Sequence, residues 1–139
     1  AANSDTWATE IGKLSRTRPI DIISRRGLAR GESGGITLIG ILGSISGSFV
    51  IATIGYFLDI NTSYFIIVFI SGFLGSLFDS ILGSTLQSRF ILMDGKTIKE
   101  EKEKDSYLYS GLHYINNNSV NFLCTLSAPI FFILLYLIA

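Results

Sequence analysis

Three long runs of apolar residues alternate with polar segments along this chain of 139 residues. The runs cover residues 36–58, 64–86 and 120–138. Each approaches the roughly 20 residues that an α-helix needs to cross about 30 Å of hydrocarbon, and none contains Lys or Arg. A soluble chain of this size has too few polar positions to shield three such helices from water. The pattern therefore predicts an all-α fold, namely a polytopic helical integral membrane protein with three transmembrane helices in a single membrane domain, residues 1–139.

The polar segments are predicted to be connections, apart from a short helix at the start of the chain. Residues 3–12 favour a helix that ends near Gly12. Residues 59–63 are so few that they predict a tight turn between two transmembrane helices. Residues 89–118 are the main polar element, and their centre alternates Lys with Glu. Such alternation is typical of a solvated loop.

Composition and charge agree with a membrane protein and predict its orientation. Hydrophobic residues make up 48% of the chain and charged residues only 16%, whereas soluble domains contain about 25% charged residues. Lys and Arg fall in two stretches, 13–30 and 89–104, and the 59–63 turn has none. The positive-inside rule therefore predicts cytoplasmic polar loops. The net charge is zero and by itself says nothing about partners. From the apolar runs we expect a lipid bilayer as the partner, and we expect no nucleic acid.

The two ends of the chain, its single cysteine and its single histidine limit other possibilities. The chain begins with Ala1 instead of Met and ends inside an apolar run, so we expect it to be the C-terminal part of a longer chain. Cys124 is the only cysteine and lies in an apolar run, so it is predicted to pack as a small apolar side chain without an intrachain disulfide. His113 is the only histidine, and zinc sites need several ligands. It is therefore predicted to be an interfacial residue.

The second apolar run carries a polar stripe. Gly75, Asp79, Gly83 and Gln87 recur every fourth residue, with Ser80 beside them, so they share one face of a helix. Small residues on such a face predict close helix packing. An Asp at the centre of a bilayer costs about 2.5–3.5 kcal/mol, so Asp79 needs a partner or a watery cavity. It is either a functional acid or a buried hydrogen-bonding group.

The other two apolar runs carry small or polar faces as well. Gly43 and Gly47 are four residues apart in the first run and are expected to allow close packing, against the second run. Asn117 and Asn121 share a face at the start of the third run. Their amides could bind a ligand or bridge two helices.

The N-terminal helix gathers oxygen-bearing side chains. Asn3, Thr6 and Glu10 fall on one face, and Asp5 lies beside them. Two carboxylates with neighbouring hydroxyl and amide oxygens suit Mg²⁺, which proteins hold through one or two carboxylates together with substrate phosphates. The alternative is a solvated helix end near the membrane surface.

A glycine-rich turn at residues 31–35, which includes Gly34 and Gly35, precedes the first apolar run. Such a turn before a helix favours anions, because unpaired N–H groups and the helix dipole point outward. Arg30 adds positive charge. The alternative is a flexible entry to the helix, with its arginines on lipid phosphates.

These candidate residues are predicted to converge on one side of the membrane. Glu10, the 31–35 turn, Gln87 and Asn117 all fall toward the cytoplasmic interface, where nucleotides are available, and Asp79 lies about two helical turns deeper. The simplest account is phosphate chemistry at the boundary between lipid and water.

Four segments, in this order, resemble successive signatures of the transmembrane protein 19 family: residues 3–12, 32–37, 75–87 and 117–122. The most specific strings are Asn-Ser-Asp-Thr at 3–6 and Asp-Ser-Ile-Leu-Gly at 79–83, followed by Gln87. One departure is Gly31-Glu32-Ser33, where the family commonly has Gly-Thr-Asn. The family includes plant phytyl-phosphate kinase and many uncharacterised bacterial and archaeal membrane proteins.

The resemblance implies a membrane-embedded kinase that transfers a phosphoryl group from a nucleoside triphosphate, such as CTP, to a prenyl monophosphate. Under this hypothesis Asp5, Glu10 and Asp79 are catalytic, and Asp5 and Glu10 hold Mg²⁺. The other candidate residues bind substrate: Asn3, Thr6, Arg30, Gly34, Gly35, Ser80, Gln87, Asn117 and Asn121. Two alternatives stay open. They are a transporter-like protein with Asp79 as a coupling-ion site and a non-catalytic integral membrane protein.

Overall fold

The computed structural model describes residues 1–58, 61–95 and 97–138. Within them the chain forms the helices α1 (Ala2–Gly12), α2 (Leu38–Phe57), α3 (Tyr64–Thr85) and α4 (Asn117–Ile138). The last three are long and apolar enough to cross a membrane, as predicted. The short helix α1 was also expected, and it ends at Gly12. Of the predicted 59–63 turn, residues 59 and 60 lie outside the described residues.

Polar side chains fix the starts of two of these helices. The hydroxyl of Thr37 accepts a hydrogen bond from the N–H of Gly40 at 3.0 Å, so α2 begins at Leu38. The amide oxygen of Asn116 accepts one from the N–H of Ser119, also at 3.0 Å. This cap explains why α4 begins at Asn117 and not at residue 120 as predicted.

Five short strands in the described part of the chain make the all-α prediction wrong in part. Strands β1 (Ile20–Asp21) and β2 (Gly35–Ile36) form an antiparallel pair. Strands β3 (Arg89–Leu92), β4 (Ile98–Lys99) and β5 (Ser106–Ser110) form an antiparallel sheet in the order β4-β3-β5. The prediction of a loop over residues 89–118 is therefore wrong for these three strands, whereas the charged residues 101–105 between β4 and β5 are exposed as expected of a solvated segment.

Residues 89–110 have the sequence features of paired strands, but their many charged residues led to the prediction of a loop. Residues 89–92 and 106–110 are rich in Phe, Ile, Leu and Tyr, which suit strands. Gly95 takes a positive φ of 66° in the turn after β3, a conformation that glycine adopts without steric cost. Phe90 pairs with Lys99 on one side and with Leu108 on the other. The alternating Lys and Glu residues occupy β4 and the connection to β5.

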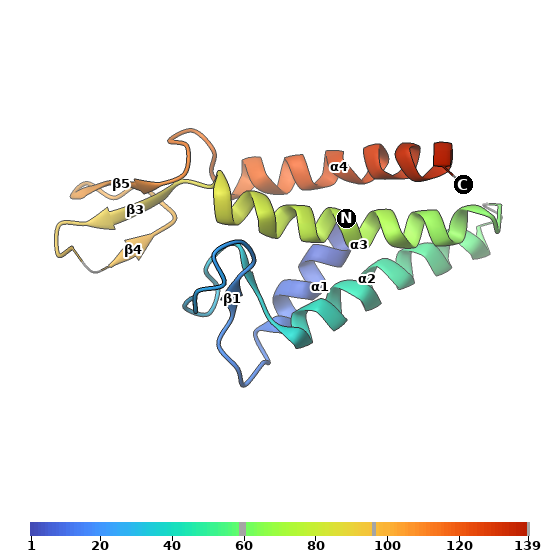
Figure 1. The fold of residues 1–139 in the computed structure, drawn as a ribbon, viewed down its shortest axis with the longest axis horizontal. Coiled ribbons are helices and arrows are strands. Elements are labelled where there is room, and N and C mark those ends of the chain that lie inside the picture. The colour runs from blue at the N-terminus through green and yellow to red at the C-terminus, as the bar shows by residue number, and fades with distance from the viewer. Residues whose placement is uncertain (59–60, 96, 139) are drawn as a thin grey trace.

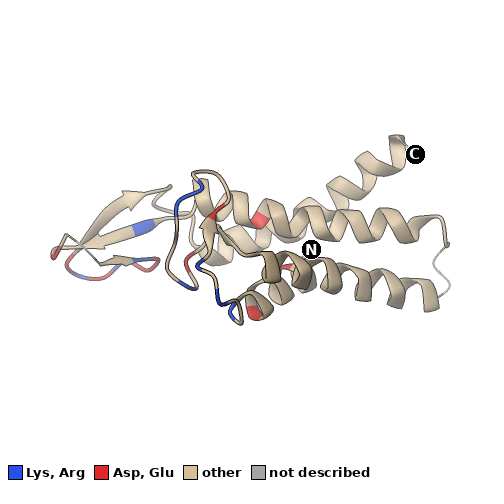
Figure 2. Ribbon diagram, turned by 60° about the horizontal axis from the view of Figure 1, so that its bottom comes forward, with Lys and Arg blue, Asp and Glu red and all other residues tan. Residues whose placement is uncertain are grey.

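Helix α3 is the centre of the arrangement (Figure 1). Helix α4 lies along one side of it, and α1 and α2 lie on the other. The three-stranded sheet extends beyond one end of the helices. Most of the charged residues lie at this same end (Figure 2). We call it the charged end; it is the end of α2, α3 and α4 from which residues 13–37 and 86–116 extend.

Helix α1 packs on the small-residue face of α2. A Cβ on Gly43 would lie 2.6 Å from the carbonyl oxygen of Trp7, closer than real Cβ contacts allow. The hydroxyl of Ser4 donates to the carbonyl of Ser44 at 2.7 Å. The glycine face was expected to pack against the second apolar run, and this expectation is wrong for Gly43, because α1 occupies the place. Glycine lets the two backbones approach closely enough for these contacts.

Few large apolar side chains are buried inside the protein. The buried apolar residues include Ile67, Leu82, Val120 and Cys124, whereas many Leu, Ile and Phe side chains of α2, α3 and α4 point outward. Cys124 packs in the interior as predicted, with its Sγ 3.3 Å from the carbonyl oxygen of Gly75. Small residues between helices and large apolar residues outside are the arrangement expected for a protein surrounded by lipid.

Candidate functional site

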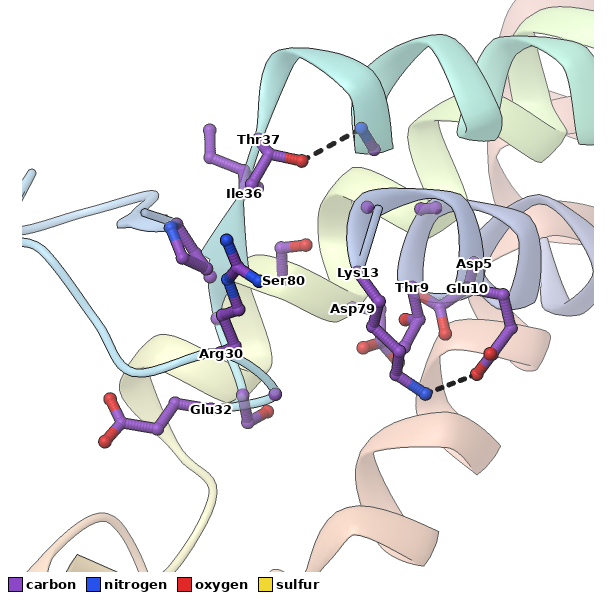
Figure 3. A pocket seen from close by; sticks show the side chains of 18 of the residues that line it. Asp5, Thr9, Glu10, Lys13, Arg30, Glu32, Ile36, Thr37, Asp79 and Ser80 are labelled. Carbon is purple, nitrogen blue, oxygen red and sulfur yellow. Dashed lines mark hydrogen bonds and ion pairs between the residues drawn. The ribbon is translucent and has the colours of Figure 1, made fainter. Parts of the chain in front are cut away.

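A cavity of about 530 Å³ opens at the charged end, between α1, the segment that leads into α2, α3 and the start of α4. Figure 3 shows side chains of α1 on one side, Arg30 and Glu32 on the other, and Asp79 and Ser80 from α3 between them. Most of the residues predicted from the sequence line this cavity: Asp5, Thr6, Glu10, Arg30, Gly34, Gly35, Asp79, Ser80, Asn117 and Asn121.

In the cavity, the charge of a carboxyl group on α3 acts on a carboxyl group of α1. Burial, and after it the negative charge of Asp79, raise the pKa of the Asp5 carboxyl to about 7. The Oδ1 atom of Asp79 is buried and has no hydrogen-bond partner among the described residues. A buried acceptor without a partner costs about 1–3 kcal/mol. A cation or a proton between Asp5 and Asp79 would offset this cost.

The cavity as a whole is acidic. Among the residues that the structure describes, five carboxyl groups and two cationic groups line it, which are Asp5, Glu10, Glu32, Asp79, Glu100, Lys13 and Arg30. An anionic substrate would be repelled by this excess of carboxylates unless a cation came with it. Within residues 1–58, 61–95 and 97–138, no three His, Cys, Asp or Glu side chains converge on one point in a metal-binding group. The carboxyl pair of Asp5 and Asp79 is nevertheless compatible with Mg²⁺, which takes one or two carboxylates together with substrate phosphates.

Glu10 has a different environment from Asp5. Its carboxylate forms an ion pair with Lys13 at 2.5 Å, and both side chains are more than half exposed. An exposed pair of this kind contributes little stability. Glu10 therefore lies at the rim of the cavity, and Asp79, not Glu10, is the carboxylate whose charge bears on Asp5.

The glycine-rich turn lies directly on the end of α3. Gly34 has a φ of +80°, and a Cβ there would lie 2.7 Å from the backbone N and Cα of Ser84. Only glycine fits this position, because a side chain would meet backbone atoms that cannot move aside. Gly35, the last residue of the turn, and Ile36 form strand β2, and α2 follows at Leu38. The turn thus leads into the helix as predicted, although the helix begins two residues after the start of the apolar run.

Ser33 joins the turn to three other parts of the chain. Its N–H donates to Glu100 Oε1 at 2.8 Å, and its carbonyl accepts from the Arg89 guanidinium at 2.7 Å. Its hydroxyl donates to Gln87 Oε1 at 2.6 Å. All its polar groups are thus satisfied by residues more than 50 positions away in the sequence.

Asp21 anchors the glycine-rich turn from the other side, a role that was not predicted from the sequence. Its carboxylate accepts from the N–H groups of Ile23 and Ser24 at 3.0 and 2.7 Å and from the hydroxyl of Ser84. Burial opposes ionisation, but these hydrogen bonds outweigh it and hold the pKa of Asp21 below its usual range. Arg89 adds a contact at 4.0 Å. An Asp side chain often accepts hydrogen bonds from backbone N–H groups two or three residues later and so favours a turn. This local preference at Asp21 is the signal that was missed.

Two of the predicted substrate-binding residues do not line the cavity. The side-chain amide of Asn3 donates to the carbonyl of Gly47 at 2.8 Å and so joins α1 to α2. Gln87 is only 1% exposed and accepts from Ser33, while its Nε2 has no partner among the described residues. Both side chains hold elements of the cavity wall in place.

Several cavity residues were not predicted. Thr9 lines the cavity and is four positions after Asp5, so the helix spacing of α1 could have indicated it. Lys13 follows one turn later. Glu100 reaches the cavity from the segment after β4, and nothing near it in the sequence indicates that contact.

Comparison with known proteins identifies a family and two relatives that this chain resembles. The family model described as "Integral membrane protein DUF92" matches residues 1–129. "Protein PGR" of Arabidopsis thaliana is 31% identical over 137 residues, which cover 89% of this chain and 47% of that protein. "Uncharacterized membrane protein MJ0933" of Methanocaldococcus jannaschii is 29% identical over 136 residues, which cover 98% of this chain and 48% of that protein. The chain thus spans about half the length of these curated relatives. No solved structure matches it.

Proposed function

The chain belongs to the DUF92 family of integral membrane proteins, and we propose that it carries the phosphoryl-transfer centre of a membrane-embedded lipid-phosphate kinase. The donor is a nucleoside triphosphate such as CTP, and the acceptor is a prenyl monophosphate. The observation that carries this proposal is the cavity at the charged end. It brings Asp5, Asp79 and Arg30 together beside helices whose outer surfaces are apolar.

The cavity has the groups that phosphoryl transfer requires. Catalysis of this reaction consists largely of positioning the reactants and neutralising charge. Arg30 and Lys13 supply positive charge at the cavity wall, and guanidinium groups match the geometry of phosphate oxygens. The side chains of Asn117 and Asn121 line the side formed by α4 and can donate hydrogen bonds to phosphate oxygens.

Mg²⁺ fits the carboxyl pair of the cavity. Asp5 and Asp79 would hold it, with Glu10 at the rim, and it would neutralise phosphate charge that the carboxylates otherwise repel. This assignment differs from the pairing of Asp5 with Glu10 that the sequence favoured. It is supported by the buried, unpartnered Oδ1 of Asp79 and by the ion pair that already engages Glu10.

The apolar helices suit an acceptor with a hydrocarbon tail. Exposed apolar side chains cover α2 and α4, among them Leu42, Phe122 and Leu126. A prenyl tail in the bilayer can lie along such a surface while its phosphate enters the polar cavity. If the charged end is cytoplasmic, as the positive-inside rule predicts, the nucleotide reaches the same cavity from water.

A transfer assay with the full-length protein tests the proposal. The purified protein, in detergent or liposomes, is incubated with Mg²⁺, with CTP or ATP labelled at the γ-phosphate, and with phytyl, farnesyl or geranylgeranyl monophosphate. We expect label in a prenyl diphosphate. A folded protein that transfers no label with any combination would contradict the kinase and would leave a transporter-like or non-catalytic role.

A further inference from the structure

A second cavity, of about 590 Å³, adjoins the first at the charged end. It lies between β3, the segment after β4 and the residues that lead into α4. Glu100 and Asn117 line both cavities, so the two share a wall. The hydrogen bond from the N–H of Ser33 to Glu100, at 2.8 Å, holds that wall to the glycine-rich turn.

We propose that this second cavity binds the nucleoside part of the donor, its ribose and base, while the phosphates of the same molecule occupy the first cavity. The inference rests on the proposed function and deepens it, since it names where the donor is recognised. The two cavities are each within the roughly 300–1,000 Å³ that small-molecule sites occupy. Two adjoining cavities of different character suit a ligand with two chemically different halves.

An aromatic surface for the base is present in the second cavity. The exposed ring of His113 lies with its centroid 5.8 Å from that of Phe90, at an interplanar angle of 75°. Phe90 is only 3% exposed, so it supports the imidazole from inside the protein. A planar base can stack on the exposed imidazole, and such stacking tolerates different bases because every base has a π-face.

Hydrogen-bonding groups surround this aromatic surface. The amides of Asn117 and Asn118 line the cavity, and each offers both a donor and an acceptor, the combination that reads the edge of a base. Asn116 is already engaged, since its oxygen caps α4. The carboxylate of Glu101 can accept from a ribose hydroxyl or from an exocyclic amino group.

Charge distinguishes the two cavities. Among the described residues that line the second cavity, Lys102 is the one Lys or Arg, and it shares the cavity with Glu100 and Glu101. The first cavity has both Arg30 and Lys13, together with the glycine-rich turn. The first cavity also carries five carboxyl groups, so it takes the phosphates together with the Mg²⁺ that Asp5 and Asp79 would hold. The neutral nucleoside then belongs in the second cavity.

Equilibrium binding to the full-length protein in detergent tests this division. The ligands are radiolabelled CTP and ATP, with unlabelled inorganic triphosphate as the competitor. We expect His113→Ala to raise the Kd for CTP about tenfold, because the base loses its stacking surface. The KM for the prenyl monophosphate should stay unchanged. Tyr109→Ala is the matched control, because Tyr109 is an exposed aromatic residue on β5 that lines neither cavity.

Cysteine labelling gives a second readout that does not need catalysis. His113→Cys and Asn118→Cys place a thiol in the second cavity, and Tyr109→Cys places one outside it. Cys124 is only 1% exposed and serves as an unreactive background. We expect CTP to slow maleimide labelling at 113 and 118 and to leave labelling at 109 unchanged, while inorganic triphosphate protects none of them.

Each outcome separates this inference from the kinase proposal. Nucleotide binding that depends on His113, without phosphoryl transfer, would support the cavity assignment and contradict the kinase. If the protein transfers label but neither His113→Ala nor Tyr109→Ala changes the Kd for CTP, the cavity assignment alone is overturned. Inorganic triphosphate that competes as well as unlabelled CTP would also overturn it. Wild-type protein that binds no nucleotide would overturn both.

Discussion

The hydroxyl of Ser84 lies 2.8 and 2.9 Å from the two carboxylate oxygens of Asp21. This contact joins the last turn of α3 to strand β1, 63 residues earlier in the chain. Together with the backbone contact between Gly34 and Ser84, it fixes the glycine-rich turn against the end of α3. The shape of the candidate site therefore depends on two contacts between distant segments.

Replacing Asp21 should destabilise the protein in a pH-dependent way. Asp21→Asn loses charge-assisted hydrogen bonds in a buried place, which costs about 1–3 kcal/mol at neutral pH. The folded pKa of Asp21 lies below its usual value, so the contribution is present above the unfolded pKa of about 3.9 and is lost as the pH falls through the folded pKa. Thermal unfolding in detergent, followed by Trp7 fluorescence, measures this. The control is Asp105→Asn, at an exposed position.

The difference between wild type and Asp21→Asn should therefore shrink as the solution is acidified below about pH 4. A difference that stayed constant between pH 7 and pH 3 would contradict the assigned role of the carboxylate.

The glycine at position 34 should not tolerate any side chain. Gly34→Ala places a Cβ against the backbone of Ser84, and its φ of +80° is also unfavourable for Ala. We expect a loss of stability of about 2 kcal/mol or more, because left-handed backbone alone costs about 1–2 kcal/mol. Gly27→Ala is the matched control, since nothing lies within 4 Å of a Cβ there. Limited proteolysis of the segment between α1 and α2 would detect the loosened turn. Equal cleavage of the two variants would show that Gly34 does not hold it.

Close packing of α1 on α2 should be needed for the site. Gly43→Ala sets a Cβ 2.6 Å from the carbonyl oxygen of Trp7, so α1 must move away and take Asp5 with it. We expect altered Trp7 fluorescence, a lower unfolding temperature and weaker phosphoryl transfer. Ser46→Ala, on the exposed side of the same helix, is the control. Phosphoryl transfer at the wild-type rate in Gly43→Ala would show that the active centre does not depend on the position of α1.

The carboxyl pair should matter more to catalysis than the rim carboxylate. Asp79→Asn and Asp5→Asn are expected to lower kcat about a hundredfold or more, the scale seen when a charge-stabilising group is removed from an active site. Glu10→Gln should lower it by about tenfold or less, because Glu10 is exposed and paired with Lys13. The measurement is the Mg²⁺ dependence of prenyl diphosphate formation, with Asp105→Asn as control. If Glu10→Gln lowered kcat more than Asp79→Asn, the residues that hold Mg²⁺ would be Asp5 and Glu10 instead of Asp5 and Asp79.

The sequence by itself determined the membrane class, the three apolar helices and the family. Hydrophobic length is a local property, so residues 36–58, 64–86 and 120–138 could be identified without knowledge of their neighbours. The short strings around Asp5 and Asp79 indicated the family resemblance, and the match to the integral membrane family DUF92 confirms it.

Only the tertiary structure decided which surfaces meet. Glycine stripes allow close approach but do not specify a partner, so the sequence could not show that Gly43 faces Trp7 and not α3. Strands need partners distant in the chain, and the alternating Lys and Glu residues concealed the pairing of Phe90 with Lys99 and Leu108. The contacts of Glu100 with Ser33 and of Asp21 with Ser84 join residues more than 60 positions apart. No local pattern encodes such contacts, because they arise from the packing of whole elements.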